Sequence, residues 1–239
     1  MKLVAALVVL AACGPVDAKH PDARVVPDVA PTPDMPPQPF RHVITIDGVD
    51  DFSPTELFST TSTSFSARIT WDDENLYVGY EGPDLSTTTS DADKKWLFVY
   101  VDTAAGGETQ SQQYNTQRAT FPGTFAADYY ARYKVDGTFA SLEHASGGGT
   151  WTSDSSGPTT GQSGTFAEMA IPLSKIGAGA SLDIVTYMIN EKALAEGTFA
   201  GLYLTNFTDG YSTNMPLTAY LHVDFTSQRN PNDDANKRP

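Results

Sequence analysis

The feature that most constrains the fold is a series of short segments in which apolar and polar residues alternate. The clearest segment, residues 65–71, places four apolar side chains on one face: Phe65, Ala67, Ile69 and Trp71. Alternation with a period of two is the pattern of a β-strand with one buried face. An acidic stretch at residues 72–75 then resembles a turn, and residues 76–80 return with the same character. This pair predicts a β-hairpin.

The rest of the central region has the same organisation. Residues 96–101 are apolar on both faces, which predicts a strand at the centre of a sheet. Asp136-Gly137 predicts a hairpin turn, because glycine accepts a positive φ without penalty. Further strands are predicted at residues 128–135, 138–144, 165–171, 182–190, 199–205 and 218–225, with loop at 147–149 and 152–164. Proline at 172 and glycine at 177 bracket one short helical turn. The prediction is an all-β fold, an antiparallel β-sandwich of jelly-roll or immunoglobulin-like type.

The charge balance and the cysteine count exclude several classes. The chain of 239 residues has a formal net charge of −14. An acidic surface repels phosphate backbones, so a nucleic acid partner is not expected. The only cysteine is Cys13, which excludes an internal disulfide and any site that needs two thiolates.

The N-terminus accounts for that cysteine. Lys2 precedes an apolar run at residues 3–12, which has the length of a signal-peptide core and is too short to span a bilayer. Residues 10–14 (Leu-Ala-Ala-Cys-Gly) resemble the bacterial lipobox. The resemblance implies that residues 1–12 are a removed signal peptide and that Cys13 is lipidated. We therefore expect a cell-envelope lipoprotein held by acyl chains, with Gly14 favouring the outer membrane.

Composition divides the remainder into three parts. Residues 13–39 hold eight prolines between Asp and Ala residues, which predicts an extended tether without a core. Residues 40–226 carry the strand signals and form the predicted sandwich domain. Residues 227–239 are polar and are predicted to be a disordered tail.

Four short motifs, in order, resemble the β-sandwiches of carbohydrate-binding module family 9 and the DOMON-like domains. They are residues 46–51 (Ile-Asp-Gly-Val-Asp-Asp), 71–78 (Trp-Asp-Asp-Glu-Asn-Leu-Tyr-Val), 99–102 (Val-Tyr-Val-Asp) and 166–173 (Phe-Ala-Glu-Met-Ala-Ile-Pro-Leu). Together they span most of the predicted domain. The resemblance implies a β-sandwich that binds carbohydrate. One difference is Phe98, which stands where sugar-binding members often carry an acid.

Glycan sites use aromatic faces that stack on sugar C–H surfaces, with amides and carboxylates that bind the hydroxyls. Trp151 is the strongest candidate, because it lies between a triple glycine and a polar loop. The full set of candidate ligand-binding residues is Trp151, Trp96, Tyr129, Tyr133, Asp102, Asn206, Tyr211 and Asn214. For each tryptophan and tyrosine, a role in the core is the competing interpretation.

Five aspartates in or beside turns are candidate ligands for a structural calcium ion, which prefers several carboxylate and carbonyl oxygens. They are Asp47, Asp50, Asp51, Asp72 and Asp73. The competing interpretation is that each aspartate caps its own turn through backbone N–H groups.

Three other functions stay open alongside carbohydrate binding. A glycosidase needs only two carboxylates, and Asp102, Glu143 and Glu168 are conceivable, although no nucleophile elbow, zinc motif or phosphate loop is present. A DOMON-like domain that binds haem would use axial histidine and methionine. The available residues are His144, His222, Met169, Met188 and Met215. The third alternative is a protein-interaction module of an envelope complex. The sequence therefore favours a non-catalytic, envelope-anchored domain that recognises a glycan.

Overall fold

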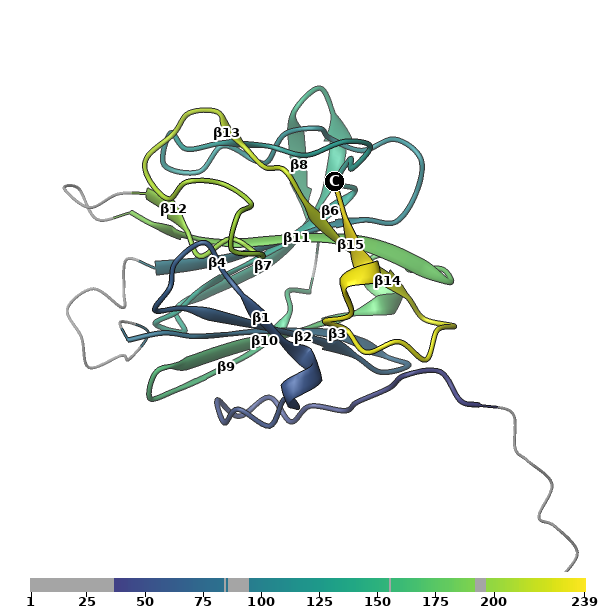
Figure 1. Ribbon diagram of the computed structural model, residues 1–239. Coiled ribbons are helices and arrows are strands. Elements are labelled where there is room, and N and C mark those ends of the chain that lie inside the picture. Colours follow the sequence, from purple (N-terminus) through teal and green to yellow (C-terminus); the bar gives the residue numbers. More distant parts are fainter. Residues whose placement is uncertain (1–36, 84, 86–94, 155, 192–196) are drawn as a thin grey trace, which may run out of the picture. The chain divides into compact units, whose positions relative to one another are not determined.

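Two β-sheets packed face to face form the domain in the computed structural model, which describes residues 37–83, 85, 95–154, 156–191 and 197–239 (Figure 1). The five-stranded sheet has the order β1-β2-β3-β10-β9. Its strands are β1 (Leu57–Ser59), β2 (Ser66–Trp71), β3 (Asn75–Glu81), β10 (Phe166–Pro172) and β9 (Thr159–Ser163). Every pair in this sheet is antiparallel.

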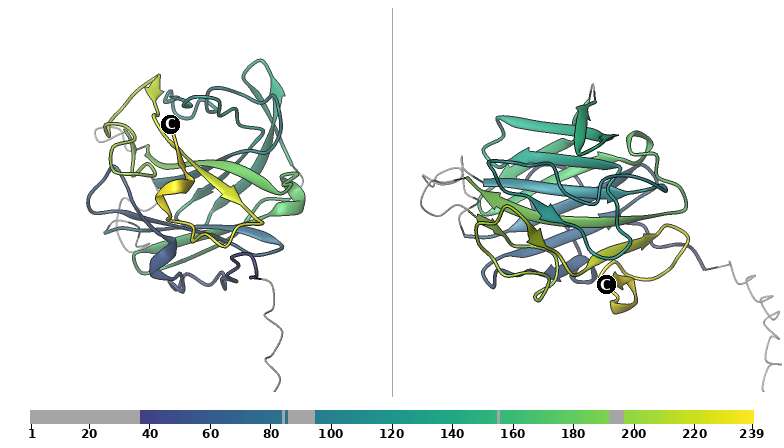
Figure 2. Two further views of the ribbon diagram at one scale, coloured as in Figure 1. Left: turned by 45° about the vertical axis from the view of Figure 1, so that its right-hand side comes forward. Right: turned by 90° about the horizontal axis from the view of Figure 1, so that it is seen from above.

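The eight-stranded sheet has the order β15-β14-β11-β4-β6-β7-β8, with β12 also paired to β11. Its strands are β15 (Lys237–Arg238), β14 (Tyr220–Asp224), β11 (Ser181–Asn190), β4 (Lys95–Asp102), β6 (Tyr129–Lys134), β7 (Phe139–Gly147), β8 (Thr150–Ser153) and β12 (Gly197–Phe199). All of its pairs are antiparallel. The predicted all-β antiparallel sandwich is confirmed, and the two layers are seen edge-on in the left view of Figure 2.

Short elements complete the domain. They are the 3-10 helices η1 (Pro54–Glu56), η3 (Leu173–Lys175) and η4 (Asp234–Asn236), and the strands β5 (Ala119–Thr120) and β13 (Met215–Pro216). The two-residue pair β5–β13 is parallel and lies in the loops outside both sheets. The predicted helical turn after Pro172 is confirmed as η3.

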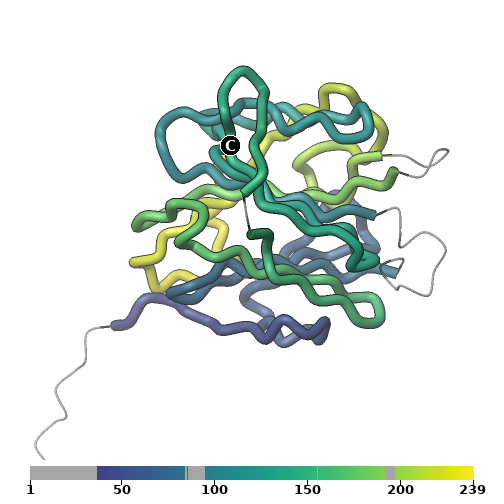
Figure 3. Tube along the Cα trace, turned by 180° about the vertical axis from the view of Figure 1, so that it is seen from behind, coloured from purple at the N-terminus to yellow at the C-terminus, as the bar shows by residue number. Residues whose placement is uncertain are grey.

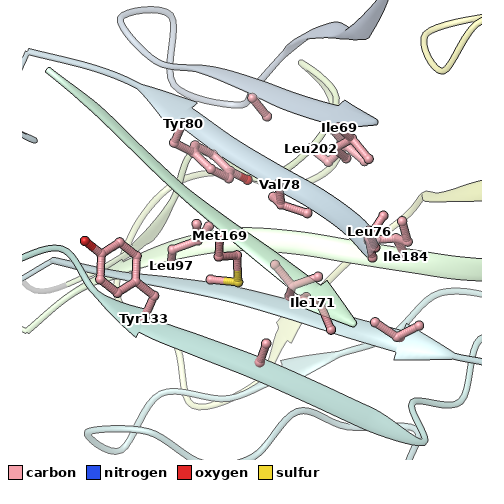
Figure 4. Close-up of a cluster of buried hydrophobic side chains, with 14 of the residues drawn as sticks. Ile69, Leu76, Val78, Tyr80, Leu97, Tyr133, Met169, Ile171, Ile184 and Leu202 are labelled. Atoms are coloured by element: carbon pink, nitrogen blue, oxygen red, sulfur yellow. The ribbon is translucent and has the colours of Figure 1, made fainter. Parts of the chain in front are cut away.

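The principal core lies between the sheets and follows the predicted alternation. Ile69, Val78, Met169 and Ile184 come from strands of both layers and are fully buried (Figure 4). Trp71 packs at one end of this core, where its ring meets those of Phe40 and Phe225 at 5.4 and 6.0 Å. Strand β4, predicted to be central because it is apolar on both faces, indeed lies between β11 and β6.

Two predictions of local structure are wrong. Residues 152–164 were expected to be loop, yet they contain the end of β8 and all of β9, which pairs with β10 over five residues (Figure 3). The backbone groups of β9 find partners there although its side chains are polar. Conversely, the strand predicted at 199–205 ends at Phe199, since Ala200 and Tyr203 adopt positive φ angles of 49° and 73°.

The C-terminal segment, predicted to be a disordered tail, is instead ordered. Strand β15 pairs with β14 at Tyr220 and Leu221. The side-chain amide of Asn232 donates to the backbone carbonyls of Pro54 and Leu57. Polar side chains that bond backbone groups hold this segment, so its hydrophilic composition does not indicate disorder.

Candidate functional site

The outer face of the eight-stranded sheet, which points away from the principal core, carries an unusual number of rings. Side chains alternate along β4 and β6, so one set enters the principal core and the other faces outward. The outward set and the loops above it form what we call the outer aromatic cluster. Its main members are Trp96, Phe98, Tyr100, Phe121, Phe125, Tyr130 and Tyr187, with Tyr114 and Trp151 partly buried against them.

Trp151 joins this cluster from strand β8. Its ring lies edge-on to that of Tyr130, with centroids 4.9 Å apart and planes at 87°. It also meets Tyr100 edge-on at 6.0 Å. Tyr100 and Tyr130 stack on each other at 5.2 Å. Trp151, the strongest candidate from the sequence, is therefore part of the outer aromatic cluster and not a free loop side chain.

Arg132 on β6 contacts several rings of the outer aromatic cluster. Its guanidinium carbon lies between 4.9 and 6.0 Å from the centres of four rings: Phe139, Tyr114, Trp96 and Tyr130. Cations are attracted to ring faces at such distances. The same guanidinium contacts the Glu143 carboxylate at 3.1 Å and donates to the Ser141 hydroxyl at 3.1 Å. The result is a planar cation held in place next to a buried carboxylate.

The outer aromatic cluster contains buried polar atoms that lack a hydrogen-bond partner among the described residues. They are Nε1 of Trp96, Nε1 of Trp151 and the hydroxyls of Tyr100 and Tyr130. The Tyr130 hydroxyl is close enough to Glu143 for that carboxylate to raise its pKa, after the larger effect of burial, yet the two form no regular hydrogen bond. An unsatisfied buried donor costs about 1–3 kcal/mol, so four on one face call for an explanation.

The structure brings three of the predicted ligand residues to this face. Trp96, only 7% exposed, lies under Tyr114 with ring centroids 4.8 Å apart. Trp151 packs against the same cluster. Asp102, half-buried, ends β4 on the same side of the sheet. Burial, assisted by the charges of Asp128 and Asp183, raises the pKa of Asp102 to about 6.

Three other predicted residues lie elsewhere. Tyr133 is 2% exposed and is part of the principal core, and Tyr129 packs at the edge of that core. Asn206 is also buried. Its amide donates to the carbonyls of Leu202 and Ala219 and accepts from the backbone N–H of Thr218, so it holds a loop in shape.

Tyr211 and Asn214 remain at the surface, in the loop beside the cluster. Tyr211 is 52% exposed, and its hydroxyl bonds that of Thr116 at 2.6 Å. Asn214 accepts a hydrogen bond from the Thr120 hydroxyl. Both partners belong to residues 103–127, so the two loops above the outer face are linked to each other.

Calcium binding by the five proposed aspartates stays a prediction. Within the ranges that the structure describes, no three His, Cys, Asp or Glu side chains gather closely enough to hold an ion. Each carboxylate has a local partner. Asp47, Asp51 and Asp72 accept backbone N–H groups within the same stretch of chain, and Asp50 and Asp73 pair with Arg68 and Arg41. The competing interpretation, aspartates that cap turns, describes most of these contacts.

The three conceivable catalytic acids are divided between opposite faces. Glu168 points to the outside of the five-stranded sheet, where it accepts the backbone N–H groups of Asp47 and Gly48 at 2.9 and 2.6 Å. Asp102 and Glu143 lie on the outer face of the other sheet. The contact of Glu168 joins two of the motifs on which the family resemblance rests, so those motifs have a structural role.

The residues considered for haem have other roles. Met169 and Met188 are packed in the principal core and Met215 in the outer aromatic cluster, which is the ordinary place of methionine. Both histidines bond carboxylates: His144 contacts Asp154 at 3.0 Å and His222 contacts Asp183 at 2.7 Å.

Sequence reasoning missed Tyr100, Arg132 and Tyr114. The first two could have been found, because strand alternation places Tyr100 with Trp96, and Arg132 with Tyr130. Tyr114 lies in a loop, and no local pattern indicates that it covers Trp96. Cys13 lies outside the described residues, so its lipidation stays a prediction. No helix in the described part of the chain is long and apolar enough to cross a membrane.

Comparison with known proteins gives one resemblance of note. No family model matches the chain, and no curated protein matches it. Among solved structures, a carbohydrate-binding module of family 9 from Caldicellulosiruptor kristjanssonii, in complex with cellotriose, is similar with a TM-score of 0.40 and 14% identity. The match covers 74% of this chain and 91% of that one. The strand pairing within the two sheets itself defines the sandwich fold.

Proposed function

We propose that the domain is a non-catalytic module that binds a glycan at the outer aromatic cluster. The observation that carries the proposal is the set of four aromatic N–H and O–H groups that are buried on one face and form no regular hydrogen bond with the described residues. Sugars present both an apolar C–H face, which stacks on rings, and hydroxyls, which accept hydrogen bonds from such groups. The outer aromatic cluster, which has both rings and hydrogen-bond donors, can therefore bind the C–H faces and the hydroxyls of a sugar.

Arg132 and Glu143 add polar contacts at the edge of the outer aromatic cluster. Their charges compensate each other at 3.1 Å, so the pair offers both donors and acceptors without a net charge. Lys134 is similarly paired with Asp136 at 3.0 Å. We infer a neutral ligand, recognised through hydroxyls, as the better match for this face.

Location is the second part of the proposal. The sequence pattern at residues 10–14 supports lipidation of Cys13, and the proline-rich tether would hold the module away from a membrane. Under this model the protein displays the module at the cell envelope, where it captures a polysaccharide. Partner proteins of the envelope would be further ligands of the same tethered domain.

The test is a glycan array followed by calorimetry on residues 14–239, which omit the signal and the cysteine. Two tyrosines on opposite faces of β6 supply a matched pair of variants. Tyr130→Phe removes a cluster hydroxyl that forms no regular hydrogen bond with the described residues, and we expect it to weaken binding about fivefold or more. Tyr133→Phe removes a hydroxyl on the opposite face and should leave affinity unchanged.

Trp151→Ala should abolish binding, because it removes the ring that packs edge-on against both Tyr130 and Tyr100. Equal loss in Tyr133→Phe and Tyr130→Phe would contradict the placement of the site. Failure of the folded wild-type chain to bind any glycan, over a broad array, would reject the carbohydrate proposal and favour a protein partner.

A further inference from the structure

Residues 103–127, which we call the strap, connect two neighbouring strands by an unusually long route. They leave the end of β4 and return to the start of β6, although these strands are hydrogen-bonded neighbours. On the way they cross the outer aromatic cluster and place Phe121 and Phe125 on it. Figure 1 shows the strap as blue-green coil beyond the eight-stranded sheet, on the side away from β1 and β2.

The strap packs on two of the four rings that carry the donors of the proposed site. Tyr114 lies over Trp96, and Phe121 lies 5.0 Å from the ring of Tyr100. Within the strap, the Nε group of Arg118 is also buried without a partner among the described residues. The buried donors of Trp96 and Tyr100 therefore lie beneath strap residues.

Two aspartates hold the strap at its ends. Asp102 accepts the backbone N–H of Ala126 at 2.8 Å. Asp128 accepts the backbone N–H groups of Thr103 and Ala104, each at 2.8 Å. Each carboxylate therefore holds the end of the strap that lies next to the other carboxylate. We call this reciprocal arrangement the clasp.

From this geometry we propose that the strap is a lid over the outer aromatic cluster, and that the Asp102–Asp128 clasp holds it more firmly at acidic than at neutral pH. The inference rests on the proposed function for its purpose, since the lid would control access of a glycan. The movement itself is a property of the chain alone.

The direction in which pH changes the opening of the strap follows from the charges around the clasp. Two carboxylates face each other there, and a third, Asp183, stands opposite Asp102 in the strand register. Burial of Asp102 raises its pKa from 3.8 to about 6, with help from the charges of Asp128 and Asp183 and against the opposing effect of the hydrogen bond from Ala126. Lifting the strap returns Asp102 to water, so opening releases a proton. Opening is therefore favoured as the pH rises through about 6.

Other ionisable groups lie near the clasp, and the experiment must distinguish their effects on the strap from that of Asp102. Asp183 bonds His222, and the charge of Arg238 also acts on it. On the side of β6, a hollow of about 250 Å³ lies between Asp128 and His144. A variant of Asp102 that keeps all of these groups isolates its own contribution.

The experiment is hydrogen exchange with mass spectrometry on residues 14–239, without a glycan, at pH 5 and pH 8. Rates are corrected for the intrinsic effect of pH. We expect peptides from the strap to be about tenfold better protected at pH 5, and a peptide from β3 to be equally protected at both. Asp102→Asn keeps an acceptor for Ala126 and loses the charge, so strap protection should become independent of pH.

Two further variants keep the test decisive. Asp136→Asn, at the β6–β7 turn, leaves the clasp intact and should behave as wild type. Asp183→Asn removes one of the charges that raise the pKa of Asp102, and should move the midpoint to lower pH. Equal strap protection at both pH values in wild type, or a pH effect that survives Asp102→Asn, would overturn the proposal.

Glycan binding then separates this inference from the function on which it rests. A strap that opens with pH in a chain that binds no glycan leaves the lid intact and rejects the carbohydrate function. Glycan association at the same rate at pH 5 and pH 8 rejects the lid and leaves the function standing.

Discussion

Replacement of Glu168 offers the sharpest test of how this fold is held together. Its side chain is fully buried, and one oxygen accepts the backbone N–H groups of Asp47 and Gly48. The second oxygen has no partner among the described residues. Burial raises the pKa of Glu168 from 4.5 to about 7, and the charges of Asp51 and Asp47 act in the same direction.

The raised pKa makes the unfolding free energy depend on pH. In the unfolded chain the carboxyl loses its proton near pH 4.5, whereas in the folded chain it keeps the proton until about pH 7. The stabilisation is therefore complete below pH 4.5 and is lost as the pH rises to about 7. At about 1.4 kcal/mol per pH unit, the loss amounts to about 3 kcal/mol.

Glu168→Gln removes this dependence and keeps an acceptor for both N–H groups. We expect the unfolding free energy of the variant, minus that of wild type, to increase by about 3 kcal/mol between pH 4.5 and pH 7.5. Urea unfolding followed by tryptophan fluorescence measures both values. Glu81→Gln is the matched control, because Glu81 lies on the adjacent strand with a hydroxyl partner, Thr165. A difference for Glu168→Gln that stays constant over this range would refute the reasoning.

The remaining predictions concern stability and are measured by thermal unfolding followed by circular dichroism. Gly48→Ala should destabilise by about 2–3 kcal/mol, because φ is +83° there and the added Cβ would lie 2.5 Å from the Gln162 carbonyl carbon; wild-type stability would contradict the packing of residues 46–51. Asn206→Ala should cost about 2–4 kcal/mol by leaving buried backbone groups unsatisfied, whereas Asn214→Ala, at the exposed end of the same loop, should cost less than about 0.5 kcal/mol. Removal of residues 227–239 should lower Tm by roughly 2–4 °C for each kcal/mol of stability lost, and an unchanged Tm would restore the prediction of a disordered tail.

Local patterns were sufficient for the parts of the fold in which burial follows the strand period. The hairpin around residues 72–75 and the central strand at 96–101 have their apolar residues where the sequence placed them, since one face or both faces of each strand are buried. Strand β9 was missed, because its side chains are polar and its formation depends on pairing with β10. The C-terminal segment was misjudged for a similar reason: backbone contacts with distant residues order it.

The candidate site divides in the same way. Trp151 and Trp96 could be selected from sequence as aromatic residues in unusual or strongly apolar surroundings, and the structure places both in the outer aromatic cluster. The alternation also separates Tyr133 from Tyr130, but it does not say which of the two faces is the core. That choice depends on which side of the sheet the second sheet covers.

The sequence by itself determined the class of this protein: strand-period alternation specifies an antiparallel sandwich, and the lipobox-like start with its proline-rich continuation predicts export and tethering. Only the tertiary structure decided that the rings of β4, β6 and β8 form a second, outer cluster, and that the strap crosses it. The same holds for Glu168, whose partners lie about 120 residues earlier in the chain. The physical reason is that periodicity reports which side chains share a face, whereas the partners of buried polar groups are set by contacts between distant segments.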